Sequence, residues 1–209
     1  MRDLVVLCAD GMWRATLQAI LLRHESLGLA RALDADVRHI PGETDGGARA
    51  RGAKILWYER SKFAHALLIF DHDGCGDLRP PDEIQAEIDK DLGADWAGKA
   101  RSIVVAPEVE GWIVGGHKHF ARIRGLERAQ AREWLAERDH WPKGVDKPSD
   151  PKGALAALFF AHGAKLTSVN YRKIMSHASL NPERCTCASF KLFCEILRGW
   201  FGPTGRVSR

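Results

Sequence analysis

The sequence predicts an α/β fold, in which a mostly parallel sheet is flanked by helices and followed by a helical C-terminal lobe. Two observations support this prediction. Apolar runs alternate with helical stretches over residues 1–116, as in parallel strands joined by helical crossovers. The run Ala66–Phe70 is continuously apolar, which is typical of a strand buried on both faces. After residue 116 such runs stop.

The expected elements of the first part follow one another along the chain. Four strands are expected within 4–10, 36–42, 65–71 and 101–115. Helices are expected at 11–26, 53–63 and 80–96, the last of which begins with two prolines that suit a helix N-terminus. The polar and Gly-rich stretch ETDGGARARG, residues 43–52, predicts a loop.

The second part, residues 117–209, is expected to form a basic helical lobe packed on the core 1–116. Its first helix is expected at 126–141, where good helix formers dominate. A Pro, Gly and Lys linker follows at 142–153, and two more helices are expected in ALAALFFAHGAK and ASFKLFCEILRGWF.

The amino-acid composition excludes several classes of protein. Of the 209 residues 45% are hydrophobic, which argues against disorder. No apolar run approaches the length of a membrane span, and the N-terminus lacks the apolar region of a signal peptide. Five scattered cysteines suit a reducing compartment. We therefore expect a cytoplasmic protein without membrane contact.

Charge is divided unevenly between the two parts. Residues 1–116 hold 14 Lys and Arg against 19 Asp and Glu, a net charge of −5, whereas residues 117–209 hold 17 against 8, a net charge of +9. An acidic site served by a basic docking surface would suit a nucleic acid, DNA or RNA. A solvated Arg-rich helical surface explains the division equally well.

Acidic residues follow three of the expected strands. They are Asp10 after the first, Asp71, Asp73 and Asp77 after the third, and Glu108 and Glu110 in the fourth. Parallel strands end at one edge of a sheet, so these acids are expected to converge there, with Asp71 and Asp73 pointing the same way. The alternative for the DxD sequence is an ordinary turn signal.

A cluster of carboxylates needs a positive partner, and Mg²⁺ or Mn²⁺ prefers oxygen ligands. Two such ions would stabilise the attacking and leaving oxygens of phosphodiester cleavage. Candidate phosphate-binding cations are Lys152, Lys165, Arg172 and Lys173, with Arg49 and Arg51 in the GGARARG stretch. Each of them has a solvated surface cation as its alternative interpretation.

Five segments together resemble the TOPRIM fold of topoisomerases, primases and overcoming-lysogenisation-defect nucleases, and more closely a family of small bacterial TOPRIM-like proteins. They are VVLCADG, LLIFDHDGCGD, VAPEVEGWIVG, SDPKGAL and CTCASFKLFCEIL. The resemblance implies a metal-dependent nuclease-like site with Asp71, Asp73 and Glu110 as ligands and Asp10 as a ligand or water-orienting base. It also implies a place among phage-defence proteins, including methylation-associated systems.

Two departures from the TOPRIM pattern keep other functions open. The first strand ends in Asp10 where the family has Glu, and Arg14 stands where a second Glu is common. Both suit a non-catalytic interaction subunit of a defence complex. The DHDG sequence also resembles the nucleophile motif of haloacid-dehalogenase-type phosphatases, although that motif usually opens the chain.

The cysteines near the C-terminal end offer a zinc site by residue type. Cys185, Cys187 and Cys194, with His177, are possible ligands. The CxC spacing is tighter than in most structural zinc sites, and Cys187 and Cys194 fall at helical spacing with Phe190 and Phe193, which favours burial as small apolar side chains.

Overall fold

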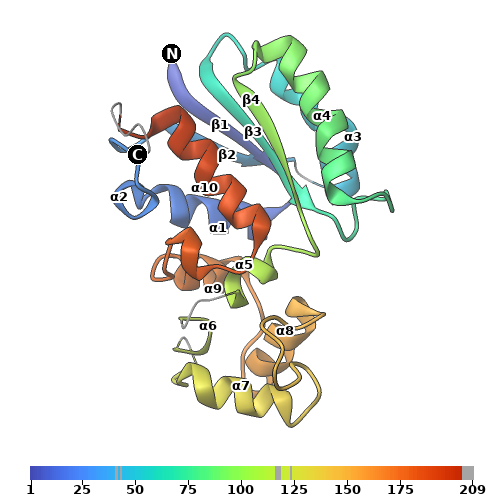
Figure 1. Cartoon of the computed structure of the whole chain (residues 1–209), viewed down its shortest axis with the longest axis vertical. Helices are drawn as coiled ribbons and strands as arrows, with labels where there is room; N and C mark the ends of the chain where they lie inside the picture. The colour runs from blue at the N-terminus through green and yellow to red at the C-terminus, as the bar shows by residue number, and fades with distance from the viewer. Residues whose placement is uncertain (41, 43, 116–118, 123, 204–209) are drawn as a thin grey trace.

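The fold is a four-stranded parallel sheet covered by helices on both faces, which confirms the α/β class (Figure 1). The computed structural model describes residues 1–40, 42, 44–115, 119–122 and 124–203. The strands are β1 (Arg2–Cys8), β2 (Ala35–His39), β3 (Phe63–Asp71) and β4 (Ala100–Val105), and they lie in the order β2-β1-β3-β4.

The helices form two layers on the sheet. On one face lie α1 (Gly11–Leu21), α2 (His24–Leu27) and α10 (Ala188–Phe201), and on the other lie α3 (Asp45–Trp57) and α4 (Pro81–Trp96). Between β4 and α10 come α5 (Glu110–Val114), α6 (His119–Arg122), α7 (Arg128–Ala136), α8 (Pro151–Ala161), α9 (Ser168–Met175) and the short 3-10 helix η1 (Pro182–Arg184).

The strand register brings the ends of three strands to the same level. Cys8 of β1 pairs with Ile69 of β3, so Asp10 and Asp71 each follow their paired residue by two positions. Asp71 in turn pairs with Val105, the last residue of β4. The residues that follow β1, β3 and β4 therefore meet at the carboxyl edge of the sheet, as parallel strands require.

The expected loop at 43–52 is wrong, because α3 begins at Asp45 and includes most of this stretch. Its glycines lower the helix propensity. However, Ala48, Gly52 and Leu56 recur at helical spacing and are buried. Gly52 permits a close approach to the sheet, since a Cβ there would lie 2.5 Å from Leu68 Cδ1. Packing against β3 thus outweighs intrinsic propensity.

The helices after residue 116 do not form one separate group. The last two return to the sheet region, where α9 packs on α1 and α10 packs along β4. In contrast, α7 and α8 extend from the end of the molecule at which the strands terminate (Figure 1). Within the described ranges, no helix is both long enough and apolar enough to cross a bilayer.

Candidate metal centre

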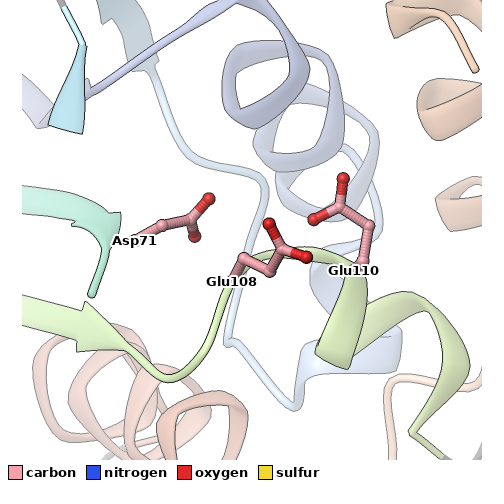
Figure 2. Close-up of side chains that lie close together, drawn as sticks. All are labelled: Asp71, Glu108 and Glu110. Carbon is pink, nitrogen blue, oxygen red and sulfur yellow. The ribbon is translucent and has the colours of Figure 1, made fainter. Parts of the chain in front are cut away.

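Three carboxylates converge at the carboxyl edge of the sheet. Asp71 ends β3, Glu108 lies in the loop after β4, and Glu110 begins α5. One carboxylate oxygen from each lies within 4.8 Å of the others. Figure 2 shows the three side chains turned toward a common point. The segment around Glu110 is helical rather than extended as expected, so Glu108 and Glu110 approach each other through a turn.

The three carboxylates are withdrawn from solvent. Asp71 is 7% exposed, Glu108 9% and Glu110 1%. Burial, with the like charge of Asp45 and Glu110, raises the pKa of Asp71 well above its usual value. Burial also raises the pKa of Glu110, and the nearby Glu108 adds to this rise against the hydrogen bond from Tyr171. Their ionised forms are therefore costly without a cation.

Two side chains from other elements hold Asp71 in place. The indole Nε1 of Trp13, on α1, donates to Asp71 Oδ1 at 3.0 Å. The backbone amide of Asp71 donates to Asp45 Oδ1 at 2.7 Å, where α3 begins. Trp13 is itself packed edge-on against Trp112, with ring centroids 5.0 Å apart. These contacts leave Asp71 little freedom to turn away from the cluster.

Glu110 has one satisfied oxygen and one orphaned oxygen. The hydroxyl of Tyr171, on α9, donates to Oε1. The other oxygen, Oε2, is buried and has no hydrogen-bond partner. A buried carboxylate oxygen without a partner is expensive, and native structures usually supply a donor, a water or an ion. Glu110, which carries this orphaned oxygen, belongs to the same cluster as Asp71 and Glu108.

Glu108 meets the N-terminal end of α8. The ammonium of Lys152 lies 3.2 Å from Glu108 Oε2, and the Lys152 backbone amide donates to Oε1 at 3.2 Å. Burial lowers the pKa of Lys152, but the carboxylates of Glu110 and Glu108 outweigh it, so this pKa is raised. Among the described residues, Lys152 is the cation in ion-pair contact with the cluster, and one ammonium cannot balance three carboxylates.

Asp10 lies on the wall of an adjoining cavity of about 540 Å³, which Asp71, Glu110, Lys152 and Tyr171 also line. Its Oδ1 accepts from the Trp13 backbone amide at 2.8 Å, so it caps α1. Asp is among the preferred N-cap residues, whereas Glu is not. The local helix start thus explains why Asp suits this position.

The residues present fit a divalent cation. The cluster combines three converging carboxylate oxygens, an orphaned buried oxygen and too little positive charge. Hard cations with oxygen ligands supply what this arrangement lacks. The cluster could therefore hold a metal ion.

Three of the predicted acidic ligands lie outside the cluster: Asp10, on the wall of the adjoining cavity, and Asp73 and Asp77. β3 ends at Asp71 and the chain turns at Gly74, whose φ is 90°, so the expected strand alternation does not reach Asp73. The side chain of Asp73 is 65% exposed. Asp77 pairs with Arg79 at 2.8 Å and Arg49 at 3.1 Å. These pairings, led by Arg79, hold the pKa of Asp77 well below its usual value.

The predicted phosphate-binding cations are scattered over the surface. Arg49 pairs with Asp77, and Arg51 is exposed on α3, which covers the opposite face of the sheet from α1. Lys165 and Lys173 are exposed near or on α9, and neither lines the cavity beside the cluster. Of the six, Lys152 contacts the carboxylates.

The cysteines are packed rather than grouped as ligands. Cys185, Cys187 and Cys194 are buried. In the part of the chain that the structure describes, the carboxylate cluster is the only group of three or more potential metal ligands with converging atoms. Cys187 Sγ instead donates to the Gly111 carbonyl at 3.0 Å.

Three residues that support the cluster are absent from the sequence-based candidates: Trp13, Asp45 and Tyr171. Trp13 falls on the apolar face of the expected helix 11–26, which predicts a core residue. That pattern gives no sign that its indole N–H reaches Asp71. Asp45 lies in the stretch 43–52, which was expected to be a loop, so no role was predicted for it. Tyr171 stands next to Arg172, but only the packing of α9 on α1 brings it to Glu110.

Replacing Tyr171 by Phe should destabilise the metal-free protein. The variant removes the donor to Glu110 Oε1 and leaves both buried oxygens without a partner. We expect the free energy of unfolding, measured by urea titration in EDTA, to fall by about 1–3 kcal/mol. Tyr58→Phe is the control, because Tyr58 is 61% exposed. Equal effects of the two substitutions would contradict the assigned role.

Comparisons of the chain with protein-family models, curated proteins and solved structures found no match.

Proposed function

We propose that the chain is a Mg²⁺- or Mn²⁺-dependent hydrolase of nucleic-acid phosphodiesters. The observation that carries the proposal is the buried group of Asp71, Glu108 and Glu110, in which Glu110 Oε2 has no partner. A divalent ion would complete this group. The adjoining cavity of about 540 Å³ supplies room for a phosphate and its sugar.

The residues around the cluster have separable roles in this proposal. Asp71, Glu108 and Glu110 would hold the metal, which when bound polarises a phosphoryl oxygen and lowers the pKa of a bound water. Lys152 would move its ammonium from Glu108 toward a phosphate oxygen, because Lys152 itself lines the cavity. Asp10 would orient a water through Oδ2, because Oδ1 is engaged in capping α1.

A nucleic acid is the substrate class that the charge distribution favours. The part of the chain after residue 116 has a net charge of +9 and supplies Lys152 and Tyr171 to the cavity. A polyanion would be attracted to this part and led toward the carboxylates. A role in antiviral defence, in the cytoplasm and with protein partners of a defence system, rests on the TOPRIM resemblance.

The test is incubation of the purified chain with plasmid DNA, single-stranded DNA and RNA in Mn²⁺ or Mg²⁺. We expect cleavage of at least one substrate, and EDTA should abolish it. Calorimetric titration with Mn²⁺, run on the same preparation, should show binding. A folded protein that neither binds Mn²⁺ nor cleaves any of the three substrates would contradict the proposal.

A non-catalytic interaction subunit is the second candidate, and the position of Asp10 favours it. Asp10 caps α1, so the acid after β1 has a structural use that does not require catalysis. This candidate predicts Mn²⁺ binding without cleavage, together with co-purification of a partner protein. The phosphatase alternative gains no support, because Asp73, the second acid of that motif, is 65% exposed and outside the cluster.

A further inference from the structure

A second cavity, of about 450 Å³, lies between α1, α9 and the edge strand β2. Two arginines line it, Arg14 from α1 and Arg172 from α9. Leu21, Leu22 and Leu33 form apolar parts of its wall. We call this cavity the arginine groove. Its combination of cationic and apolar surface suits a ligand that has an anionic group and a flat apolar group.

The two arginines are not neutralised by neighbouring acids. Among the described residues, neither Arg14 nor Arg172 forms an ion pair, and Arg172 donates instead to the neutral Gln18 Oε1. Both are exposed. The acid that lines the groove, Asp36, is already bound by Arg2 at 3.1 Å and Arg38 at 2.6 Å. The groove therefore keeps an uncompensated positive charge.

Asp36 is stably ionised by those partners. Burial raises its pKa, but the hydrogen bond and charge of Arg38, with the charge of Arg2, outweigh burial and leave the pKa lowered. Asp36 is thus not available to neutralise the groove arginines, and they remain free to pair with an incoming anion.

The arginine groove adjoins the metal centre through shared helices. On α1, Trp13 contacts Asp71 and the next residue, Arg14, lines the groove. On α9, Tyr171 contacts Glu110 and the next residue, Arg172, lines the groove. On each of these two packed helices, one residue contacts the carboxylate cluster and the next residue lines the arginine groove. The two sites therefore lie side by side.

We propose that the arginine groove binds a nucleotide of a single-stranded segment next to the phosphate that is cleaved; this deepens the proposed function and rests on it. Arg14 lies about one helical turn, ~5.4 Å, beyond Asp10 along α1. Asp10 lines the cavity beside the carboxylates, so neighbouring nucleotides of one strand would reach both that cavity and Arg14.

The arginines hold the phosphate of that nucleotide, and the leucines pack against its base. An unpaired base can turn outward onto such a wall, whereas a base in a duplex stays within its stack. The groove thus selects single-stranded nucleic acid, and it assigns a ligand-binding role to Arg14, one of the two residues that depart from the TOPRIM pattern.

Binding in the absence of metal tests this inference. The affinity of the full chain for a fluorescein-labelled single-stranded oligodeoxynucleotide is measured by anisotropy in EDTA over a series of salt concentrations. Arg14→Gln and Arg172→Gln should each weaken binding about tenfold. Each should also reduce the slope of log K against log salt by about 0.7, the loss expected for one phosphate contact with a single strand.

Arg60→Gln is the matched control, since it removes the same charge from an exposed arginine that precedes β3, at the opposite end of the sheet from the metal centre. The control should bind as the wild type does, and all three variants should bind Mn²⁺ normally by calorimetry. A labelled duplex should bind more weakly than the single strand and should be less sensitive to the groove substitutions.

The inference is overturned if both groove variants bind like the wild type, if Arg60→Gln weakens binding equally, or if the wild type does not bind the oligonucleotide in EDTA. Failure of the proposed function has a different signature, which is absence of Mn²⁺ binding and of cleavage by the wild-type protein. The two failures are therefore distinguishable in one set of preparations.

Discussion

Asp71→Asn should reduce the affinity for Mn²⁺ by about 100-fold or more and abolish nucleic-acid cleavage. Outer-shell substitutions at metal sites already cost about 10–100-fold, and Asp71 would be a direct ligand. Asn keeps the size and can still accept the hydrogen bond from Trp13 Nε1, so the local packing is retained. Calorimetric titration and a cleavage assay measure the two losses.

Asp73→Asn is the matched control for this substitution. It makes the same chemical change two residues away, at a side chain that is 65% exposed and does not join the carboxylate cluster. We expect normal Mn²⁺ affinity and normal cleavage. If Asp73→Asn were as damaging as Asp71→Asn, the metal would have to bind at the DxD turn rather than at the group formed with Glu108 and Glu110.

The metal-free protein should lose stability as the pH rises above about 4.5. The folded-state pKa values of Asp71 and Glu110 lie above their ordinary values of 3.8 and 4.5. A carboxyl with a raised pKa binds its proton more tightly in the folded chain than in the unfolded chain. Its destabilising effect is absent below the unfolded pKa, grows through the window between the two values, and is complete above the folded pKa.

Other acids act in the opposite direction at lower pH. The pKa values of Asp3, Asp36 and Asp77 are lowered, so their stabilising effect develops as the pH rises toward the ordinary value of 3.8. The free energy of unfolding in EDTA should therefore pass through a maximum near this range and then decline. Each unit by which a buried carboxyl's pKa is raised costs about 1.4 kcal/mol at high pH.

Urea unfolding in EDTA at pH values from about 5 to about 8 measures the decline, because this range lies above the ordinary pKa values of the buried carboxyls. Asp71→Asn should flatten it, because the amide does not ionise. Mn²⁺ at 100 times its dissociation constant should restore about 2.7 kcal/mol at neutral pH to the wild type only. A wild-type curve that is flat in EDTA and insensitive to Mn²⁺ would contradict the electrostatic account of the cluster.

The pattern of the strands was predictable because it depends on local information. Continuous apolar runs such as Ala66–Phe70 avoid water only when both faces of the strand are buried. Their alternation with helical stretches implies parallel strands joined by helices. The parallel arrangement then brings the acids after β1, β3 and β4 to one edge. The placement of Asp71 and Glu110 at the same edge follows from this topology.

Predictions that depended on the exact end of an element were less accurate. Asp73 was expected to point with Asp71, but β3 ends at Asp71, two residues before Asp73, and Gly74 turns the chain. The stretch 43–52 was expected to be a loop, but burial of Ala48 and Gly52 against the sheet makes it helical from Asp45 onward. The first error concerns a local turn, whereas in the second a local pattern was overridden by packing against a distant strand.

The amino-acid sequence is enough to predict the class of the fold, the sheet edge at which the acids gather and the excess of negative charge there. Which acids form the cluster, and which side chains hold them, depends on how the helices pack in three dimensions. Trp13, Asp45 and Tyr171 contact the cluster residues from positions 26 to 61 residues away along the chain. Such contacts are made by helix packing, which no local periodicity encodes.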